Sequence, residues 1–255
     1  ESFILSPYDI HNGTLSSIST TMLLYQDLLP TVSQGQIISA KFVDIENALI
    51  EAFESGLGYK YYYTASTSAG SYNYHNLIRR SGGDLASSNS APYVRGVASI
   101  NSEYPILWED PDDLKLSVII NGSRKLLTPE EYSGIDSNID YIEGIICIGG
   151  GEKFCIMLQD AQTGPIESIS TAKTLYGDIL PTSVQGCIIS AKMDNINTNI
   201  SKFGGDPLSY PSYYYTTETK SGYYNYHNLI HGSGGDLSYS NSAPYIRGVV
   251  NLNEE

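Results

Sequence analysis

Histidine and cysteine are the residues of this chain that could carry acid–base, nucleophilic or metal chemistry. The four histidines are His11, His75, His227 and His231. His75 and His227 occupy the same place in a repeated Tyr-Asn-Tyr-His-Asn-Leu segment, and neither has a second candidate ligand at helical or hairpin spacing. A metal centre needs several such ligands, so the spacing argues against one. The favoured interpretation is that both histidines are polar residues within strands.

The chain also has three cysteines, Cys147, Cys155 and Cys187. Cys147 and Cys155 flank a run of three glycines and could face each other across a hairpin as a disulfide. Ile4 and Gln36 stand at the places of two of the cysteines in the first of two repeats described below. The fold therefore does not require the cysteines, and we expect them to be small core or surface residues.

No Ser-His-Asp or Cys-His grouping has a recognisable context. Gly232-Ser233-Gly234 lacks the strand and helix that flank a nucleophile elbow. The sequence therefore predicts a protein that is not an enzyme and that uses no cofactor and no metal ion. A deep pocket converging on His227 and two carboxylates is the feature that would favour an enzyme instead.

Two arginines, Arg95 and Arg247, each lie two residues after a tyrosine in the last predicted strand of a repeat. Residues two apart in a strand share a face, so each arginine could help to capture an anion. The favoured interpretation is structural: each guanidinium holds its strand to a loop carbonyl or a carboxylate, such as Asp84 or Asp236.

The composition is that of a globular chain with a largely uncharged polar surface. The 255 residues are 41% hydrophobic and only 16% charged, with 22 Tyr against 5 Phe and 1 Trp. Tyrosine provides contact area and a hydroxyl with few torsions to freeze, which suits binding surfaces, although strands also favour it. The net charge of −14 argues against nucleic-acid binding, and no apolar run is long enough for membrane insertion.

The strongest pattern is an internal repeat. Residues 70–97 and 222–249 are identical at 22 of 28 positions, and Ile37-Ile-Ser-Ala-Lys recurs as Ile188-Ile-Ser-Ala-Lys. After one inserted residue, Tyr61-Tyr-Tyr-Thr aligns with Tyr213-Tyr-Tyr-Thr. The sequence predicts two modules, residues 1–101 and 139–255, joined by a β connector at residues 102–138 that contains an Asn121-Gly122 hairpin turn.

Each repeat has the order strand, two helices, then strands, which predicts an α+β module with helices on one face of an antiparallel sheet. One apolar stripe runs along the second helix of the first repeat, through Ile38, Phe42, Ile45, Leu49 and Phe53. Residues 141–158 are predicted to form a hairpin, of which the first repeat shows only the second strand, Phe3-Ile-Leu. We expect the missing partner strand to lie outside the chain or to come from the connector.

These segments resemble the C-type lectin-like superfamily. The similarity is to the bacterial branch with the Fibrobacter succinogenes major paralogous domains and to phage and Bacteroidetes surface modules. It rests on Leu180-Pro-Thr, Tyr214-Tyr-Thr-Thr-Glu-Thr and Pro244-Tyr-Ile-Arg-Gly-Val, which have counterparts in the first repeat. The resemblance implies two tandem lectin-like modules. The Glu-Pro-Asn and Trp-Asn-Asp motifs of calcium-dependent sugar-binding relatives are absent, so it does not imply that mechanism.

The two copies change character at five positions: Ser71/Tyr223, Arg79/His231, Arg80/Gly232, Ala86/Ser238 and Ser87/Tyr239. Such changes are expected of one scaffold that presents two contact surfaces, and neutral drift at solvent positions is the alternative. The predicted ligand-binding residues are Tyr223, Tyr224, Asn225, His227, His231, Tyr239 and Asn241, with Ser71, Tyr72, Asn73, His75, Arg79, Arg80 and Asn89 in the first copy.

Together these features predict a secreted recognition protein at a cell surface or on a virion. In this interpretation it is an adhesin or a phage receptor-binding protein that binds a glycan or a protein. Two sites on one chain would add avidity toward a repetitive target. The alternative is a structural subunit of a virion, tail fibre or fimbria, and the oligomeric state is left open.

Overall fold

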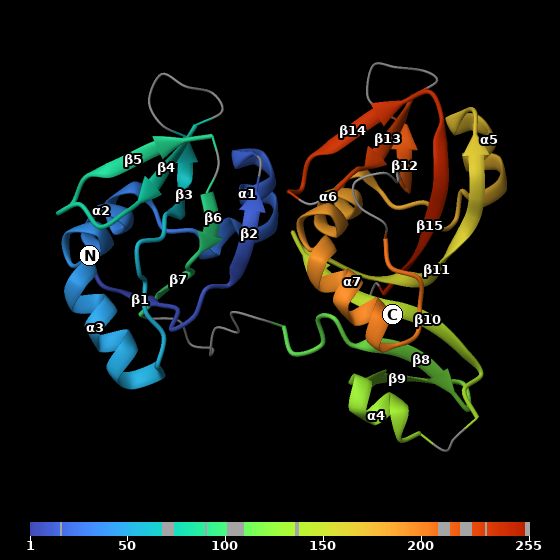
Figure 1. The fold of residues 1–255 in the computed structure, drawn as a ribbon, viewed down its shortest axis with the longest axis horizontal. Helices are drawn as coiled ribbons and strands as arrows, with labels where there is room; N and C mark the ends of the chain where they lie inside the picture. Colours follow the sequence, from blue (N-terminus) through green and yellow to red (C-terminus); the bar gives the residue numbers. More distant parts are fainter. Residues whose placement is uncertain are drawn as a thin grey trace. The chain divides into compact units, whose positions relative to one another are not determined.

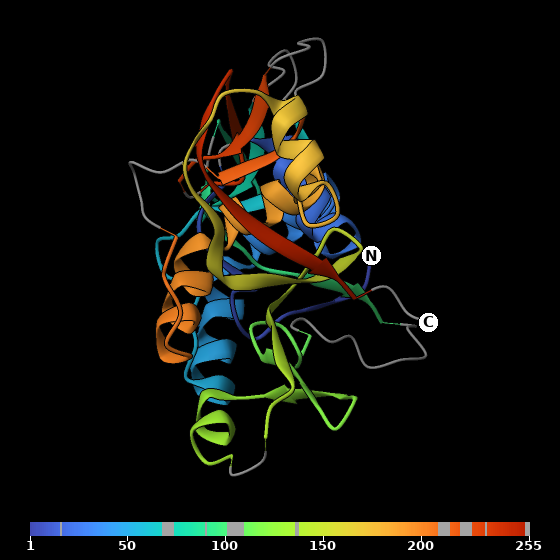
Figure 2. The same cartoon turned by 90° about the vertical axis from the view of Figure 1, so that its right-hand side faces the viewer.

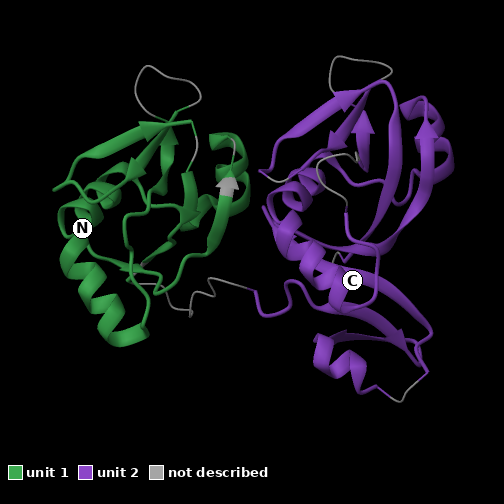
Figure 3. Cartoon of the chain, in the orientation of Figure 1, with its two compact units in different colours: residues 1–109 green, residues 110–255 purple. Residues whose placement is uncertain are grey.

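The structure is a computed structural model of the chain. It describes residues 1–15, 17–67, 74–89, 91–100, 110–135, 138–208, 215–219, 226–232 and 234–252. The chain divides into two compact units, residues 1–109 and residues 110–255 (Figure 3). Both units combine helices with β-sheet, which confirms the predicted α+β class.

The first unit runs from two strands through a group of helices to five further strands (Figure 1). In chain order its elements are β1 (Phe3–Leu5), β2 (His11–Leu15), α1 (Ile18–Tyr25), the 3-10 helix η1 (Gln26–Leu28), α2 (Val32–Ala40), α3 (Phe42–Phe53), β3 (Tyr62–Thr67), β4 (His75–Ile78), β5 (Leu85–Ser88), β6 (Ala91–Val94) and β7 (Val97–Ser99).

The second unit begins with a hairpin and a short helix, and then follows the order of the first unit. Its elements are β8 (Leu116–Ile120), β9 (Ser123–Leu127), α4 (Pro129–Ser133), β10 (Tyr141–Gly149), β11 (Glu152–Ile166), α5 (Ile169–Tyr176), α6 (Ser183–Ala191), α7 (Met193–Lys202), β12 (Tyr215–Thr219), β13 (His227–Ile230), β14 (Leu237–Ser240) and β15 (Ala243–Asn251).

The two units share one strand order, β2-β6-β3-β4-β5 in the first and β11-β15-β12-β13-β14 in the second. Their registers match as well, because Phe3 lies opposite Ser99 and its counterpart Phe154 lies opposite Asn251. Figure 2 shows β11 and β15 as long strands side by side. In the first unit each of these long strands is divided in two: β1 and β2 correspond to β11, and β6 and β7 correspond to β15.

The prediction of a wholly antiparallel sheet is wrong at one pair in each unit. β3 runs parallel to β6 with Tyr62 opposite Tyr93, and β12 runs parallel to β15 with Tyr215 opposite Tyr245. The reason lies in the connectivity. Two strands intervene in sequence between the paired ones, so no hairpin turn forces them to be antiparallel.

The prediction of two helices in each repeat is also wrong, because the long second helix is broken. Lys41, with φ −101° and ψ 17°, ends α2 and precedes α3, and Lys192 does the same between α6 and α7. The predicted apolar stripe still points largely inward. Phe53 is the exception, since it is 47% exposed at the end of α3.

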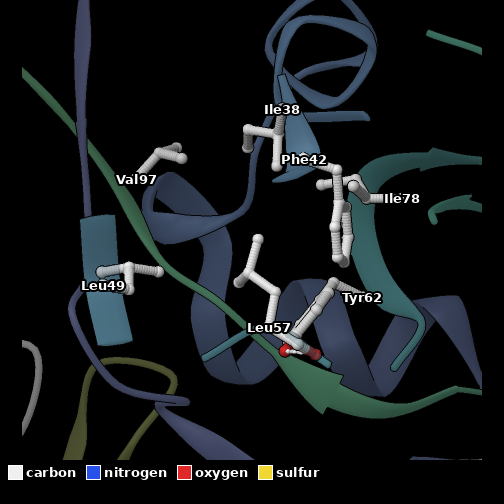
Figure 4. Close-up of a cluster of buried hydrophobic side chains, with 7 residues drawn as sticks. All are labelled: Ile38, Phe42, Leu49, Leu57, Tyr62, Ile78 and Val97. Carbon is white, nitrogen blue, oxygen red and sulfur yellow. Dashed lines mark hydrogen bonds between the residues drawn. The ribbon is translucent and has the colours of Figure 1, made fainter. Parts of the chain in front are cut away.

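The core of the first unit lies between α2, α3 and the sheet. Its buried members are Ile38, Phe42, Leu49, Leu57, Tyr62, Ile78 and Val97 (Figure 4). Tyr62 is buried but not left unpaired, because its hydroxyl donates to the carbonyl of Leu57 at 3.0 Å. The apolar spacing that predicted the helix therefore also identifies the helical members of this core, Ile38, Phe42 and Leu49.

The predicted connector hairpin is confirmed, but it belongs to the second unit. β8 and β9 are joined by Asn121 (φ 50°) and Gly122 (φ 72°), as expected of a tight Asn-Gly turn. β8 pairs with β10 and so extends the sheet of the second unit to eight strands. Asp113, which lies just before β8, accepts from the backbone of Ile148 at 2.9 Å and pairs with Lys192 at 2.6 Å.

One glycine in each unit lets a helix lie close to the sheet. A Cβ at Gly186 would stand 2.6 Å from Cγ2 of Thr217, whereas a Cβ at Gly35 would stand 3.0 Å from Cγ2 of Thr64. We expect Gly186→Ala to lower the free energy of unfolding by about 1–3 kcal/mol, because overpacking outweighs the higher helix propensity of alanine. Urea unfolding measures the loss. A loss as large in Gly35→Ala would contradict this explanation, since that site has more room.

Candidate functional site

The predicted binding residues follow the hairpins β4–β5 and β13–β14, and only some of them can be placed. Six of the predicted residues lie outside the described residues: Ser71, Tyr72, Asn73, Tyr223, Tyr224 and Asn225. The others are His75, Arg79, Arg80, Asn89, His227, His231, Tyr239 and Asn241. Their positions on the two hairpins decide which of them can act together.

The two equivalent histidines are not part of a contact surface. His75 and His227 are both 0% exposed, which corrects their prediction as ligand-binding residues. The reason is strand alternation: in Tyr-His-Asn the histidine points into the unit, while the residues on either side point the other way. Burial lowers the pKa of His75 to about 4 and also lowers the pKa of His227, so both rings are neutral near pH 7.

The two units hold this buried histidine differently. In the first unit the ring of His75 lies edge-on to Tyr63, with 4.4 Å between the ring centroids. In the second unit Nδ1 of His227 forms a hydrogen bond with Oγ1 of Thr216. Tyr63 lies opposite Leu77 and Thr216 lies opposite Leu229, so the two residues occupy equivalent places. The predicted alignment of Tyr63 with Tyr215 is therefore wrong by one residue.

The remaining predicted residues separate into two groups at opposite ends of the hairpins. In the first unit His75 pairs with Ser88 and Ile78 pairs with Leu85. Asn89, level with residue 74, therefore lies at one end, and Arg79 lies five residues along at the other, about 17 Å away at a rise of ~3.3 Å per residue, with Arg80 beyond it. The sequence predicted that these residues form a single surface, and that prediction is wrong, because they lie at opposite ends of the hairpin.

The arginine end of the first hairpin is occupied by contacts within the unit. Arg80 pairs with Glu46 at 3.6 Å and lies over the ring of Tyr59, 5.5 Å from its centroid. The carbonyl of Arg79 accepts from Ser39 at 2.7 Å. His231 has the corresponding place in the second unit, after Ile230. In the first unit, the contacts of Arg79 and Arg80 fasten the hairpin to α2 and α3.

The other end of β13 and β14 carries an aromatic and amide surface, which we call the tyrosine patch: Tyr226, Asn228 and Tyr239. The rings of Tyr226 and Tyr239 lie 5.9 Å apart at 55°, and Tyr239 is 48% exposed. Asn228 lies opposite Tyr239 and donates to Oγ of Ser183 at 2.8 Å. Asn241 lies beside the patch, just beyond β14, and is also exposed.

The patch includes Tyr226 and Asn228, which the sequence prediction missed. Both flank His227 in the repeated Tyr-His-Asn segment, so strand alternation was the signal that could have found them. The first unit presents Tyr74, 44% exposed, and Asn76 at the matching places, but Ser87 stands opposite Asn76 where the second unit has Tyr239. Within the described ranges, the second unit therefore has a pair of rings at this place, and the first has one.

The buried arginines act as structural ties. Arg247 donates to Asp160 at 2.7 Å and to the carbonyls of Met157 and Asp206 at 3.1 and 2.7 Å. Arg95 pairs with Asp9 at 2.6 Å and lies near the carbonyls of Ser6 and Gly56. Both side chains are at most 2% exposed. The predicted structural role is correct, but the predicted carboxylates, Asp84 and Asp236, are not the partners.

The thiols offer no reactive group. Cys147 and Cys155 are buried, and burial raises the pKa of Cys155 to about 12 and that of Cys187 to about 11. A Cys147–Cys155 disulfide is ruled out by the register, since Cys147 lies opposite Phe154 and Cys155 lies opposite Ile146. Neighbouring strand positions face opposite sides of a sheet, so the two thiols point apart.

A hollow of about 600 Å³ opens in the first unit, between α1, η1, the start of α2 and β7. Met22, Gln26, Asp27 and Gln34 are among the side chains that line it. None of the predicted binding residues takes part. Over the described part of the chain, no group of three or more His, Cys, Asp or Glu residues could hold a metal ion.

The chain was compared with protein-family models, with curated proteins and with solved structures, and none of the three comparisons gives a match. Among the helices that the structure describes, none has the length and apolar character needed to cross a membrane. The tyrosine patch and its counterpart are therefore interpreted from their geometry alone.

Proposed function

We propose that this chain is a non-enzymatic recognition protein whose second unit binds a glycan or a protein through the tyrosine patch. The observation that carries the proposal is the pair of rings of Tyr226 and Tyr239, 5.9 Å apart, with Tyr239 48% exposed beside Asn228. Aromatic faces provide apolar contact with little loss of side-chain entropy, and an adjacent amide provides directed hydrogen bonds.

The electrostatic character of the patch agrees with an uncharged ligand. It contains no Asp, Glu, Lys or Arg, and the chain as a whole carries a formal net charge of −14. A polyanionic ligand would be repelled by that charge, whereas a neutral glycan or a polar protein surface would not. An adhesin or a phage receptor-binding protein, secreted and displayed at a surface, is the proposed setting.

The finer assignment of the fold is part of this proposal. Two tandem C-type lectin-like modules would account for two units with the same order of strands and helices. The support is the repeated set of motifs and the matching strand order of the two units. Calcium-dependent sugar binding is not proposed, because the motifs for it are absent from the sequence.

A second candidate function is a structural subunit of a virion, tail fibre or fimbria, and one observation favours it. The outer side of α3 exposes Val43, Ile50 and Phe53 at 43%, 52% and 47%. Exposed apolar side chains grouped on one helix are typical of surfaces that associate. If Ile50→Lys converts an oligomer into a monomer in sedimentation, assembly through α3 is favoured over ligand recognition.

The proposed binding surface is tested with glycan and protein arrays. We expect Tyr239→Ser, which gives the second unit the residue of the first, to weaken binding about tenfold, because the pair of rings is lost. Tyr141→Ser is the matched control: Tyr141 is 59% exposed in the same unit, but it lies on β10, five strands away from β14. Unchanged binding in Tyr239→Ser, or equal loss in the control, would reject the patch.

A further inference from the structure

The hollow of the first unit is a cavity that the tyrosine patch leaves unused. Its most buried lining residues are apolar: Leu29, Val97 and Ala98 all lie in the core. Ala65 of β3 and Met22 of α1 extend this apolar lining. Sites for small ligands are concave and mostly apolar, with a few polar groups, and a volume of about 600 Å³ is within their range.

The polar groups at the hollow are of two kinds. Thr31 and Gln34 are engaged with each other, because they form the capping box that begins α2, and Gln34 also donates to Oε1 of Glu1 at 2.9 Å. The side chains of Gln26 and Asp27 are exposed and form no hydrogen bond or ion pair with any residue that the structure describes. A ligand would therefore meet one available amide and one available carboxylate.

The charge at the hollow favours a cation. Asp27 is the only Asp, Glu, Lys or Arg among the described residues that line it, so no cation in this lining offsets its formal charge. The formal net charge of the whole chain is −14. A cation is therefore attracted to Asp27, and an anion is repelled. Beside an apolar wall, the fitting cation is one carried on an alkyl chain, as in an amphipathic ammonium.

The second unit shows why the hollow opens in the first. Glu218 corresponds to Ala65, because the N–H of each donates to the carbonyl of the proline two residues before α6 or α2. Glu218 is the larger residue, and its Oε1 accepts from the N–H of Ser183 at 3.4 Å. Alanine leaves the matching space over the start of α2 open.

The second unit also carries an ammonium group at this place. Lys173 is the fifth residue of α5, as Met22 is the fifth residue of α1. Asp178 lies two residues before Leu180, as Asp27 lies two residues before Leu29. The first unit thus keeps the aspartate and has a methionine where the second unit has a lysine. An ammonium from outside the unit would supply the missing group.

The backbone at Gln26 is strained. It ends α1 with φ 26° and ψ −106°, a conformation that residues other than glycine rarely adopt, and Gly177 stands at its place in the second unit. Strained backbone of this kind is concentrated at binding and active sites. At the hollow it lies directly before the available carboxylate of Asp27.

The hollow lies away from the place that β10 takes in the second unit. β10 pairs with the edge of β11 that faces away from β15. Ala98 lies on β7 and its counterpart Val250 lies on β15, so in the strand order β11 separates Val250 from β10. A strand placed beside β1 in the same way would pair on the far side of β1 from Ala98.

We propose that the hollow of the first unit binds an aliphatic ammonium group, carried either by a free amine or by a lysine side chain of another protein. The ammonium pairs with Asp27, and the alkyl chain lies against Met22, Val97 and Ala98. The amide of Gln26 is available to a second polar group of the ligand. This site is independent of the tyrosine patch, which belongs to the second unit.

The test is an NMR titration of the isotope-labelled intact chain with n-hexylamine at neutral pH, beside n-hexanol as the uncharged analogue of the same length. We expect saturable shifts at the amides of Ala65 and Ala98, with n-hexylamine binding about threefold more tightly than n-hexanol. Asp27→Asn is expected to remove this preference. Glu51→Gln removes an exposed carboxylate from α3 instead and should leave the preference unchanged.

Met22→Lys gives the first unit the residue of the second and places a competing cation in the lining. We expect it to weaken the binding of n-hexylamine at least tenfold, because the new ammonium repels the ligand and can occupy its place. Met22 is 37% exposed, so the fold should accept the lysine. Val43→Lys adds the same charge on α3, at a residue that is 43% exposed, and should leave the affinity unchanged.

A lysine residue blocked at both ends separates the two sources. Affinity equal to that of n-hexylamine supports a lysine of a partner protein, and weaker binding supports a free amine. The absence of saturable shifts with n-hexylamine, equal affinity for n-hexanol, or an affinity that Asp27→Asn and Met22→Lys leave unchanged would overturn the proposal. Tyr239→Ser should not alter these titrations, so failure of this site and failure of the tyrosine patch are distinguishable.

Discussion

Replacing Arg247 with methionine is expected to lower the free energy of unfolding of the second unit by about 3–5 kcal/mol, as found when one member of a buried ion pair is removed. Arg247 is 1% exposed and holds Asp160 and two backbone carbonyls. Burial raises the pKa of Asp160 and the positive charge of Arg247 opposes that rise, so the variant leaves a carboxylate that is costly to ionise. Urea unfolding, followed by amide exchange in each unit, measures the loss.

The first unit provides a matched comparison for this result. Asp9 pairs with Lys60 at 2.8 Å as well as with Arg95, so Arg95→Met leaves the carboxylate one partner. We therefore expect a smaller loss in Arg95→Met than in Arg247→Met. The double variant Arg247→Met/Asp160→Leu should recover part of the stability, since no unpaired charge remains. Equal losses in both units, or no recovery in the double variant, would show that the ion pair is not the cause.

The repeat and the local turns could be predicted from the sequence because both depend on residues close together in the chain. Asn121-Gly122 favours positive φ at both positions, and the structure has that turn between β8 and β9. The near-identity of residues 70–97 and 222–249 likewise implies two units with one strand order. Neither inference requires knowledge of which distant segments meet.

The partners of the buried arginines could not be predicted, because they depend on contacts between distant segments. Arg247 lies 87 positions after Asp160 in the chain, and nothing local indicates that β11 passes beside β15. Asp236, which follows the nearer glycine turn, was the more obvious candidate in the sequence. The sequence identified the role of each arginine and left its partner undetermined.

The candidate site failed in the sequence prediction for a different reason. The predicted set took the histidine from the repeated Tyr-His-Asn segment and left out its two neighbours, although alternate residues of a strand face opposite sides. Applied to β13, alternation places Tyr226 and Asn228 outward with Tyr239 and turns His227 inward, as the structure has them. The one-residue shift between Tyr63 and Thr216 was hidden, because residues 61–64 match residues 213–216 at all four positions and match the structurally equivalent residues 214–217 at only three.

The second large expected effect is a loss of stability in acid, caused by the buried histidines. Both ring nitrogens of His75 are buried and have no hydrogen-bond partner among the residues that the structure describes, and burial lowers its pKa from 6.5 to about 4. The unfolded chain binds this proton as the pH falls below 6.5, whereas the folded chain does not bind it until about 4. The contribution of the neutral His75 ring to the free energy of unfolding is therefore fully present above pH 6.5. It is lost as the pH falls toward 4, and the loss amounts to about 3 kcal/mol.

His75→Phe is the variant that isolates this effect from the titration of carboxylates. Phenylalanine keeps an aromatic ring against Tyr63 and removes two buried nitrogens that lack partners, so stability at pH 7 should be unchanged or higher. Between pH 6.5 and 4 the wild type should lose about 3 kcal/mol more than the variant in urea unfolding. His227→Phe also removes a group whose pKa burial lowers, but it gives up the bond to Thr216. It should therefore also reduce the pH dependence, at a cost in stability at pH 7. Parallel pH profiles for the wild type and His75→Phe would mean that this ring gains its proton without unfolding, and that its burial does not control the acid stability of the first unit.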